Sequence, residues 1–158
     1  MIIGPGSAAF ETIVALVRRL PGMICPRWVS VETQPVALGD VVRYLVGVAG
    51  LERSHAQRFD VGGPEVMTYR EMIERVARLK GRRPRIVEVP LLSPRLSSYW
   101  LHLVTPVRAS VSRPLVEGLR NPTVARDDRI RALLPRDLTR FDEAAAAALR
   151  ARNPESLP

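Results

Sequence analysis

Strand-type and helix-type patterns alternate along residues 1–92, and this alternation limits the fold more than any other feature of the chain. Runs rich in β-branched residues at 1–3 and 85–89 are typical of strands. Between them lie segments whose apolar residues recur at helical spacing, most clearly at 7–20 and 68–80. Strands that alternate with helices are typical of an α/β protein with a parallel or mixed sheet. We therefore expect an α/β fold rather than a helical bundle.

Three of the expected helices begin with residues that commonly cap helix N-termini. Thr68 and Glu71 have the spacing of a capping box, and Gly81 follows the end of that helix. Asp40 is predicted to cap a second helix, and Thr139 is predicted to cap the last, alanine-rich one. A short strand is expected at 58–61, before a Gly-Gly-Pro turn.

The pattern becomes almost entirely helical after residue 92. Helices are expected at 93–104 and 112–119, followed by the alanine-rich helix to about residue 152. We therefore expect two regions, a strand-containing part at 1–92 and a helical C-terminal cap at 93–158.

Composition argues against several classes of partner. The net charge is +8, but the basic residues are scattered, all but Lys80 are arginine, and aromatic residues make up only 5% of the chain. Nucleic-acid surfaces usually gather basic residues around aromatic ones, so we do not expect a nucleic-acid partner. No run approaches the roughly 18 apolar residues of a membrane span. The single cysteine, Cys25, excludes an internal disulfide and suits a reducing, cytoplasmic location.

The sequence carries no recognisable catalytic set. His55 and His102 lie in different expected elements without carboxylates at ligand spacing, so no metal site is predicted. A G-x-S-x-G nucleophile motif is absent. Tyr99 has no lysine four residues later, and Lys80 has no tyrosine four residues earlier, so the tyrosine–lysine proton-transfer pair of many sugar and ketone reductases is also absent.

Gly4-Pro5-Gly6-Ser7-Ala8-Ala9 matches the G-x-G-x-x-A form of a dinucleotide-binding loop. In such a loop, small residues let backbone N–H groups approach a pyrophosphate at a helix N-terminus. Only three residues precede Gly4, however, and Pro5 removes one backbone donor. A compact NAD(P)-binding domain that uses this loop therefore stays open as an alternative.

Several segments, taken in order, resemble one family. They are Met1-Ile2-Ile3-Gly4-Pro5-Gly6-Ser7, Gln34-Pro35-Val36-Ala37-Leu38-Gly39-Asp40-Val41, Phe59-Asp60-Val61-Gly62-Gly63-Pro64-Glu65, Met67-Thr68-Tyr69-Arg70-Glu71-Met72 and Val87-Glu88-Val89-Pro90. This series resembles the C-terminal half of extended or atypical short-chain dehydrogenase/reductases, the NAD(P)-dependent epimerase/dehydratase-like and NmrA-like proteins. The resemblance covers about residues 1–92.

The resemblance implies the late strands and the substrate side of a Rossmann-like fold. It implies NAD(P) as cofactor, with Gly4, Pro5 and Gly6 near the nicotinamide, and a small-molecule substrate near Phe10, Thr33 and Gln34. In the family, the pyrophosphate loop and the tyrosine–lysine pair precede the segment that matches here, so we expect the N-terminal cofactor-binding half to be absent. No residue is assigned a catalytic role.

Two consequences and one further alternative follow from this interpretation. A half-fold leaves an open sheet edge and apolar faces, so we expect self-association or a partner that covers the missing half. The chain alone is then not expected to catalyse a reaction. The alternative is a non-catalytic interaction or assembly protein.

Overall fold

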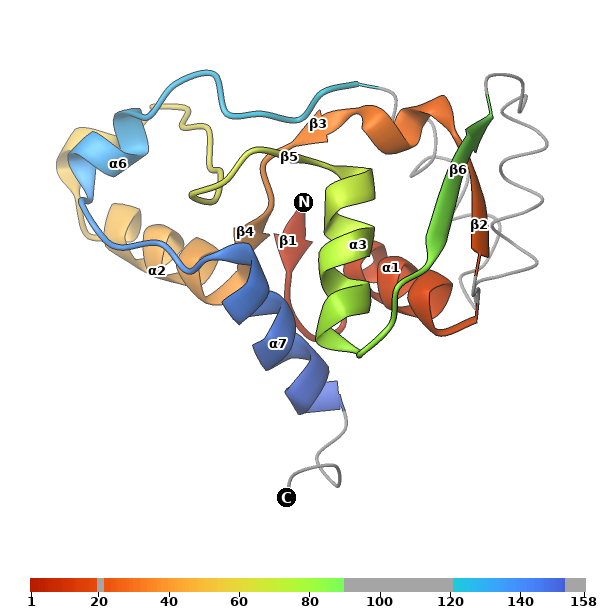
Figure 1. The fold of residues 1–158 in the computed structure, drawn as a ribbon. Helices are drawn as coiled ribbons and strands as arrows, with labels where there is room; N and C mark the ends of the chain where they lie inside the picture. Colours follow the sequence, from red (N-terminus) through yellow and green to blue (C-terminus); the bar gives the residue numbers. More distant parts are fainter. Residues whose placement is uncertain (20–21, 90–120, 153–158) are drawn as a thin grey trace. The chain divides into compact units, whose positions relative to one another are not determined.

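The computed structural model describes residues 1–19, 22–89 and 121–152, and it is a mixed α/β structure with short strands (Figure 1). The helices expected at 93–104 and 112–119 lie outside these residues. The chain divides into two compact units built from interleaved segments. Unit 1 comprises Met1–Pro5, Gln34–Val66 and Thr123–Pro158, and unit 2 comprises Gly6–Thr33 and Met67–Pro122.

Unit 1 is organised around one parallel strand pair. Strand β1 (Ile2–Ile3) pairs with β4 (Val36–Ala37), with Ile2 opposite Val36. Helix α2 (Leu38–Ala49) continues directly from β4, and the C-terminal helix α7 (Phe141–Arg152) packs against both strands. Two short helices, η2 (Glu52–Ser54) and α6 (Arg129–Leu133), complete the unit. Its buried apolar side chains include Ile3, Val36, Ala37, Tyr44, Ile130, Phe141, Ala144, Ala145 and Ala148.

Unit 2 combines two packed helices with two strand pairs. Helices α1 (Ala8–Arg19) and α3 (Tyr69–Leu79) contact each other. Strand β2 (Gly22–Pro26) pairs in parallel with β6 (Arg85–Val89), whereas β3 (Glu32–Thr33) pairs antiparallel with β5 (Met67–Thr68). A 3-10 turn, η1 (Arg27–Ser30), links β2 to β3. The core includes Phe10, Ile13, Val14, Leu16, Val17, Val29, Met72, Ile73, Val76 and Ala77.

Helix α3 confirms the local predictions at both of its ends. The Thr68 side chain accepts from the backbone N–H of Glu71, and the Glu71 carboxylate accepts from the backbone N–H of Thr68 at 2.7 Å. At the other end, Gly81 has φ +66° and donates to the carbonyl of Arg78, while Arg82 donates to the carbonyl of Ala77. These two bonds form a Schellman motif, which explains the glycine at this position.

Three local predictions in unit 1 are wrong. Residues 58–61 form no strand, because no partner strand is present beside them in the described chain. Asp40 does not cap α2, which begins at Leu38. Asp40 is fully buried and accepts instead from the backbone N–H of Thr139 at 2.9 Å. Thr139 does not cap α7, because the first N–H of that helix, at Phe141, donates to the Glu65 carboxylate at 2.9 Å.

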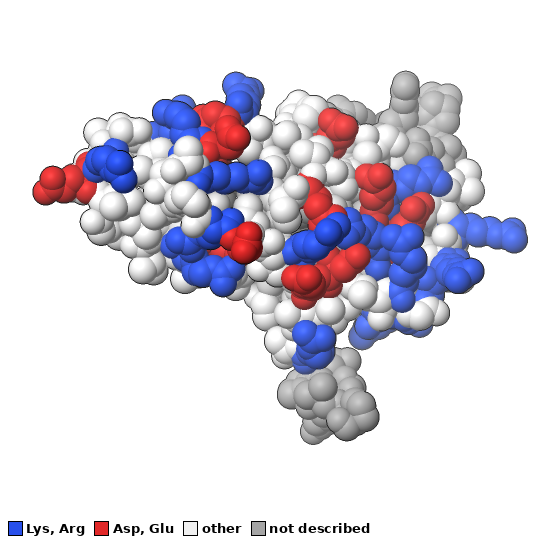
Figure 2. Space-filling model, turned by 60° about the vertical axis from the view of Figure 1, so that its left-hand side comes forward, with Lys and Arg blue, Asp and Glu red and all other residues white. Residues whose placement is uncertain are grey.

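Basic and acidic side chains are intermixed on the face of the molecule drawn in Figure 2. Several of the arginines lie in groups that also contain an aspartate or a glutamate. Within the described ranges, no helix has both the length and the apolar character needed to cross a membrane.

Candidate functional site

Gln34 connects three distant segments of unit 1. Its backbone N–H donates to the carbonyl of Thr123 at 3.0 Å. Its side-chain Nε2 donates to the carbonyl of Gly63 at 2.8 Å, and its Oε1 accepts from the backbone N–H of Ala125 at 2.9 Å. One side chain thus fixes the segment before β4, the glycine turn at 62–63 and the segment that leads to α6.

The glycine turn is glycine-specific because the chain packs directly on it. A Cβ atom at Gly63 would lie 1.9 Å from the carbonyl oxygen of Pro35, and a Cβ at Gly62 would lie 2.4 Å from the Gln34 side chain. The obstacle at Gly63 is backbone, so that position has no room for a side chain, whereas a Cβ at Gly62 would displace the Gln34 side chain from its hydrogen bonds. The Gly-Gly-Pro sequence is therefore explained by close packing against residues 34–36.

A pocket of about 250 Å³ opens beside Gln34, entirely within unit 1. We call it the Gln34 pocket. Most of its wall comes from the segment that Gln34 tethers, and part comes from the chain around the glycine turn. Its lining residues are Gln34, Asp60, Gly62, Val66, Val124, Ala125, Arg126, Asp127, Asp128, Ile130 and Arg131.

Hydrogen bonds to the main chain hold most of the polar groups of the pocket in place. Asp60 accepts from the backbone N–H of Arg126 at 2.9 Å. The Arg131 guanidinium donates to the carbonyls of Gly62 and Gly63. Because these groups are anchored, the pocket has a defined arrangement of acceptors and donors before any ligand arrives.

The electrostatic character of the pocket is mixed. Three aspartates and two arginines line it. The side-chain hydrogen bond from Arg129 lowers the pKa of Asp127, and the charge of Arg129 acts in the same direction. Asp127 therefore stays ionised at neutral pH. Such a lining suits a ligand that both donates and accepts hydrogen bonds, such as a hydroxylated or carbonyl compound, better than a strongly anionic one.

The six residues expected near a cofactor or substrate divide between the two units. Gly4, Pro5 and Gln34 belong to unit 1, whereas Gly6, Phe10 and Thr33 belong to unit 2. Of these, Gln34 lines the pocket. Phe10 and Thr33 are buried in unit 2, at 1% and 0% exposure.

The turn at 4–6 has a structural explanation for each glycine. A Cβ at Gly4 would lie 2.7 Å from Cβ of Leu38, so packing requires the glycine. Gly6 has φ +76°, a conformation that favours glycine, although nothing lies within 4 Å of its missing Cβ. Pro5 has no N–H to donate, so this turn offers fewer backbone donors than the loop of a dinucleotide site usually does. Packing at Gly4 and backbone conformation at Gly6 thus account for both glycines.

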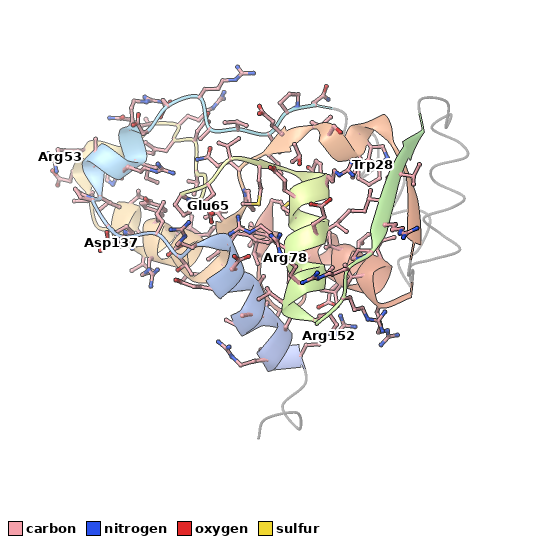
Figure 3. The ribbon with its side chains drawn as sticks, in the orientation of Figure 1. Trp28, Arg53, Glu65, Arg78, Asp137 and Arg152 are labelled. Carbon is pink, nitrogen blue, oxygen red and sulfur yellow. The ribbon has the colours of Figure 1, made fainter. Side chains whose placement is uncertain are left out.

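A second polar feature, the indole nitrogen of Trp28, lies in unit 2 (Figure 3). Its ring meets that of Tyr69 edge to face, with centroids 6.0 Å apart. Its indole Nε1 is buried and has no hydrogen-bond partner in the part of the chain that the structure describes. In that same part, no group of three or more His, Cys, Asp or Glu residues has a geometry that could hold a metal ion.

Sequence analysis missed most of the pocket. Asp60 was expected within a strand, and no binding role was predicted for Asp127 and Asp128, which directly precede α6. Arg126 and Arg131 were counted among the scattered arginines. The glycine pair that precedes Pro64 was the available signal, because adjacent glycines indicate a close backbone approach.

Comparison with models of known protein families and with the sequences of curated proteins gives no match to this chain.

Proposed function

We propose that this chain is the substrate-side part of a protein like the atypical short-chain dehydrogenase/reductases, and that the Gln34 pocket binds a small polar ligand. The ligand would be the substrate or sensed metabolite of a NAD(P)-linked system, such as a sugar or another hydroxylated carbonyl compound. The observation that carries the proposal is the pocket itself, because Gln34, expected on the substrate side, lines it and organises its wall.

The size of the pocket limits what can bind. At about 250 Å³ it is smaller than the roughly 300–1,000 Å³ of pockets for drug-sized ligands. It therefore suits a ligand of monosaccharide size or one end of a larger molecule. Its carboxylates would accept hydrogen bonds from ligand hydroxyls, and Arg126 would donate to a ligand oxygen.

The same lining argues against the pocket as a cofactor phosphate site. Asp127 is paired with Arg129, and the other two carboxylates match the two guanidiniums in number, so the wall has no excess positive charge to hold a pyrophosphate. The turn at 4–6 also offers few donors. We therefore assign the pocket to the substrate rather than to the pyrophosphate of NAD(P).

Binding by the Gln34 pocket can be tested by two-dimensional NMR on labelled protein titrated with monosaccharides and small 2-hydroxy ketones. We expect amide shifts in residues 124–131 for at least one compound. Asp128→Asn should weaken that binding about tenfold or more, because it removes a charged acceptor. The matched control is Asp137→Asn, an exposed aspartate outside the pocket (Figure 3), which should leave binding unchanged. Equal effects of the two variants, or no shifts with any compound, would contradict the proposal.

A second candidate is a non-catalytic interaction or assembly protein. One observation favours it: helix α2 exposes several large apolar side chains.

A further inference from the structure

Helix α2 has two faces of opposite character. Asp40 and Tyr44 face the interior of unit 1 and are at most 1% exposed. The opposite face carries Leu38, Val42, Leu45 and Val46, which are 41%, 48%, 62% and 70% exposed. These four residues have the helical spacing i, i+4, i+7 and i+8, which places them on one side of the helix. An apolar stripe is normally turned towards a core, and here it is turned outwards.

The stripe continues onto strand β1. A Cβ added at Gly4 would lie only 2.7 Å from the Cβ of Leu38, so Leu38 lies beside the end of β1. Helix α2 also contacts β1, the strand that carries Ile2. Ile2 is 42% exposed. Ile2, Leu38, Val42, Leu45 and Val46 therefore form one apolar surface, which we call the α2 patch.

The α2 patch is large for a surface with no function. From the exposed fractions we estimate its area at roughly 400–500 Å², within the range of the largest patches on typical monomers, which are often functional. A standard interface buries about 800 Å² on each partner. The patch thus supplies the apolar centre, though not the rim, of an interface of ordinary size.

Charge on α2 does not oppose association with an identical chain. The net charge of +8 would in general make two copies repel each other. On α2, however, the charged residues are Asp40 and Arg43, and they form an ion pair with each other. A second copy would therefore meet a neutral apolar surface here.

We infer that the α2 patch binds the same patch of a second copy of this chain, in a two-fold symmetric dimer. Leu38, Val42 and Val46 lie at intervals of four residues and form a ridge that can pack into the matching groove of an identical helix. Exposed small residues, Gly39 and Ala49, flank the ridge and permit a close approach. A two-fold axis brings the same patch together from both chains, as such packing requires. This inference does not depend on ligand binding in the Gln34 pocket.

Sedimentation velocity of the full chain over about 1–100 µM tests the inference. We expect a reversible equilibrium between monomer and dimer. Val46→Glu should weaken the dimer by roughly a hundredfold or more, because two unpaired carboxylates would be buried near the axis. Val61→Glu is the matched control. Val61 is also an exposed valine of unit 1, at 38%, but lies outside the patch, so the dimer should persist.

A cross-linking variant tests the geometry without adding charge. Val42 is the middle residue of the ridge, so Val42→Cys should form a disulfide-linked dimer under mild oxidation. Val61→Cys should not, and the native Cys25 is buried. A chain that remains monomeric over the whole range would overturn the inference. So would a dimer that tolerates Val46→Glu or fails to cross-link through Val42→Cys, since the interface would then lie elsewhere or involve a different partner.

Discussion

Unit 1 and unit 2 both contain side-chain hydrogen bonds between distant segments, such as those from Arg82 to the carbonyls of Val17 and Arg18 in unit 2, but the two units differ in their local signals. In unit 2, two amphipathic helices bury a mainly aliphatic core, and capping motifs formed by neighbouring residues define both ends of α3. In unit 1, single polar side chains join segments far apart in the sequence: Gln34 bonds to Ala125 and Asp40 bonds to Thr139. The Gln34 pocket lies in unit 1, where polar groups are already fixed by such contacts.

This difference shows where sequence patterns are informative. Helical periodicity and capping depend on residues a few positions apart, so they can be recognised in the sequence. A buried carboxylate that bonds to a residue 99 positions away leaves no local pattern. The four variants below test the contrast between the units, beginning with the largest expected effect.

Gly63→Ala should have the largest effect on stability and should act on unit 1. The added Cβ would overlap the backbone carbonyl of Pro35, which no side-chain rotation can relieve. We expect a loss of at least about 4 kcal/mol in the free energy of unfolding, measured by urea denaturation. Gly39→Ala is the control, because nothing lies within 4 Å of its added Cβ, and it should be neutral or slightly stabilising. Similar losses in both variants would show that the close packing at Gly63 is not the cause.

Met72→Ala should destabilise the chain by about 3 kcal/mol, through a cavity in unit 2. Met72 is 0% exposed on the face of α3 that packs within this unit. Met72→Leu nearly preserves the volume and should cost less than about 1.5 kcal/mol. Hydrogen exchange of the Met72→Ala variant should accelerate first in α1 and α3. Faster exchange confined to 34–66 would argue against separate cores.

Asp40→Asn should destabilise the chain by about 2 kcal/mol, because the buried position would lose a charged acceptor for Thr139. The amide would also be unable to pair with Arg43. Asp137→Asn makes the same chemical change at an exposed position and should alter the unfolding free energy little. Thermal and urea denaturation would measure both. If the two variants behave alike, the buried contact contributes nothing to stability.

Thr68→Ala should have the smallest effect, about 1 kcal/mol, by removing the side-chain half of the capping box. Thr68→Ser retains the hydroxyl and should recover most of the loss. The readout is the urea midpoint, together with the exchange rate of the first amides of α3. A loss in Thr68→Ser as large as that in Thr68→Ala would mean that the methyl group matters rather than the cap.

The predictable part of the fold is its local part. The α/β class, helix α3 with its capping box and its terminal glycine, and the stub strand at β1 followed from spacing and residue type. The capping box and the terminal glycine of α3 depend on residues close together in the sequence. Their confirmation therefore reflects short-range physical chemistry.

The unpredicted part of the fold and site depends on contacts across the chain. Asp40 resembles a helix cap in the sequence, but burial against Thr139 gives it a different partner. Residues 58–61 have strand-like composition, but no strand neighbours them among the residues that the structure describes. Asp60 and Arg126 reach the same pocket wall only because Gln34 and the glycine turn bring their segments together. No periodic pattern in the sequence predicts that arrangement.

The central claim is that this chain supplies the substrate side of a NAD(P)-linked protein and does not itself bind the dinucleotide. A thermal melt with and without excess NADPH tests it directly. A ligand at a hundredfold excess over its dissociation constant adds about 2.7 kcal/mol of stability, equivalent to a rise in Tm of roughly 5–10 °C for a chain of this size. We predict an unchanged melt. A shift of this size that disappears in Gly6→Val, while the fold persists, would contradict the claim and make the turn at 4–6 a working pyrophosphate loop.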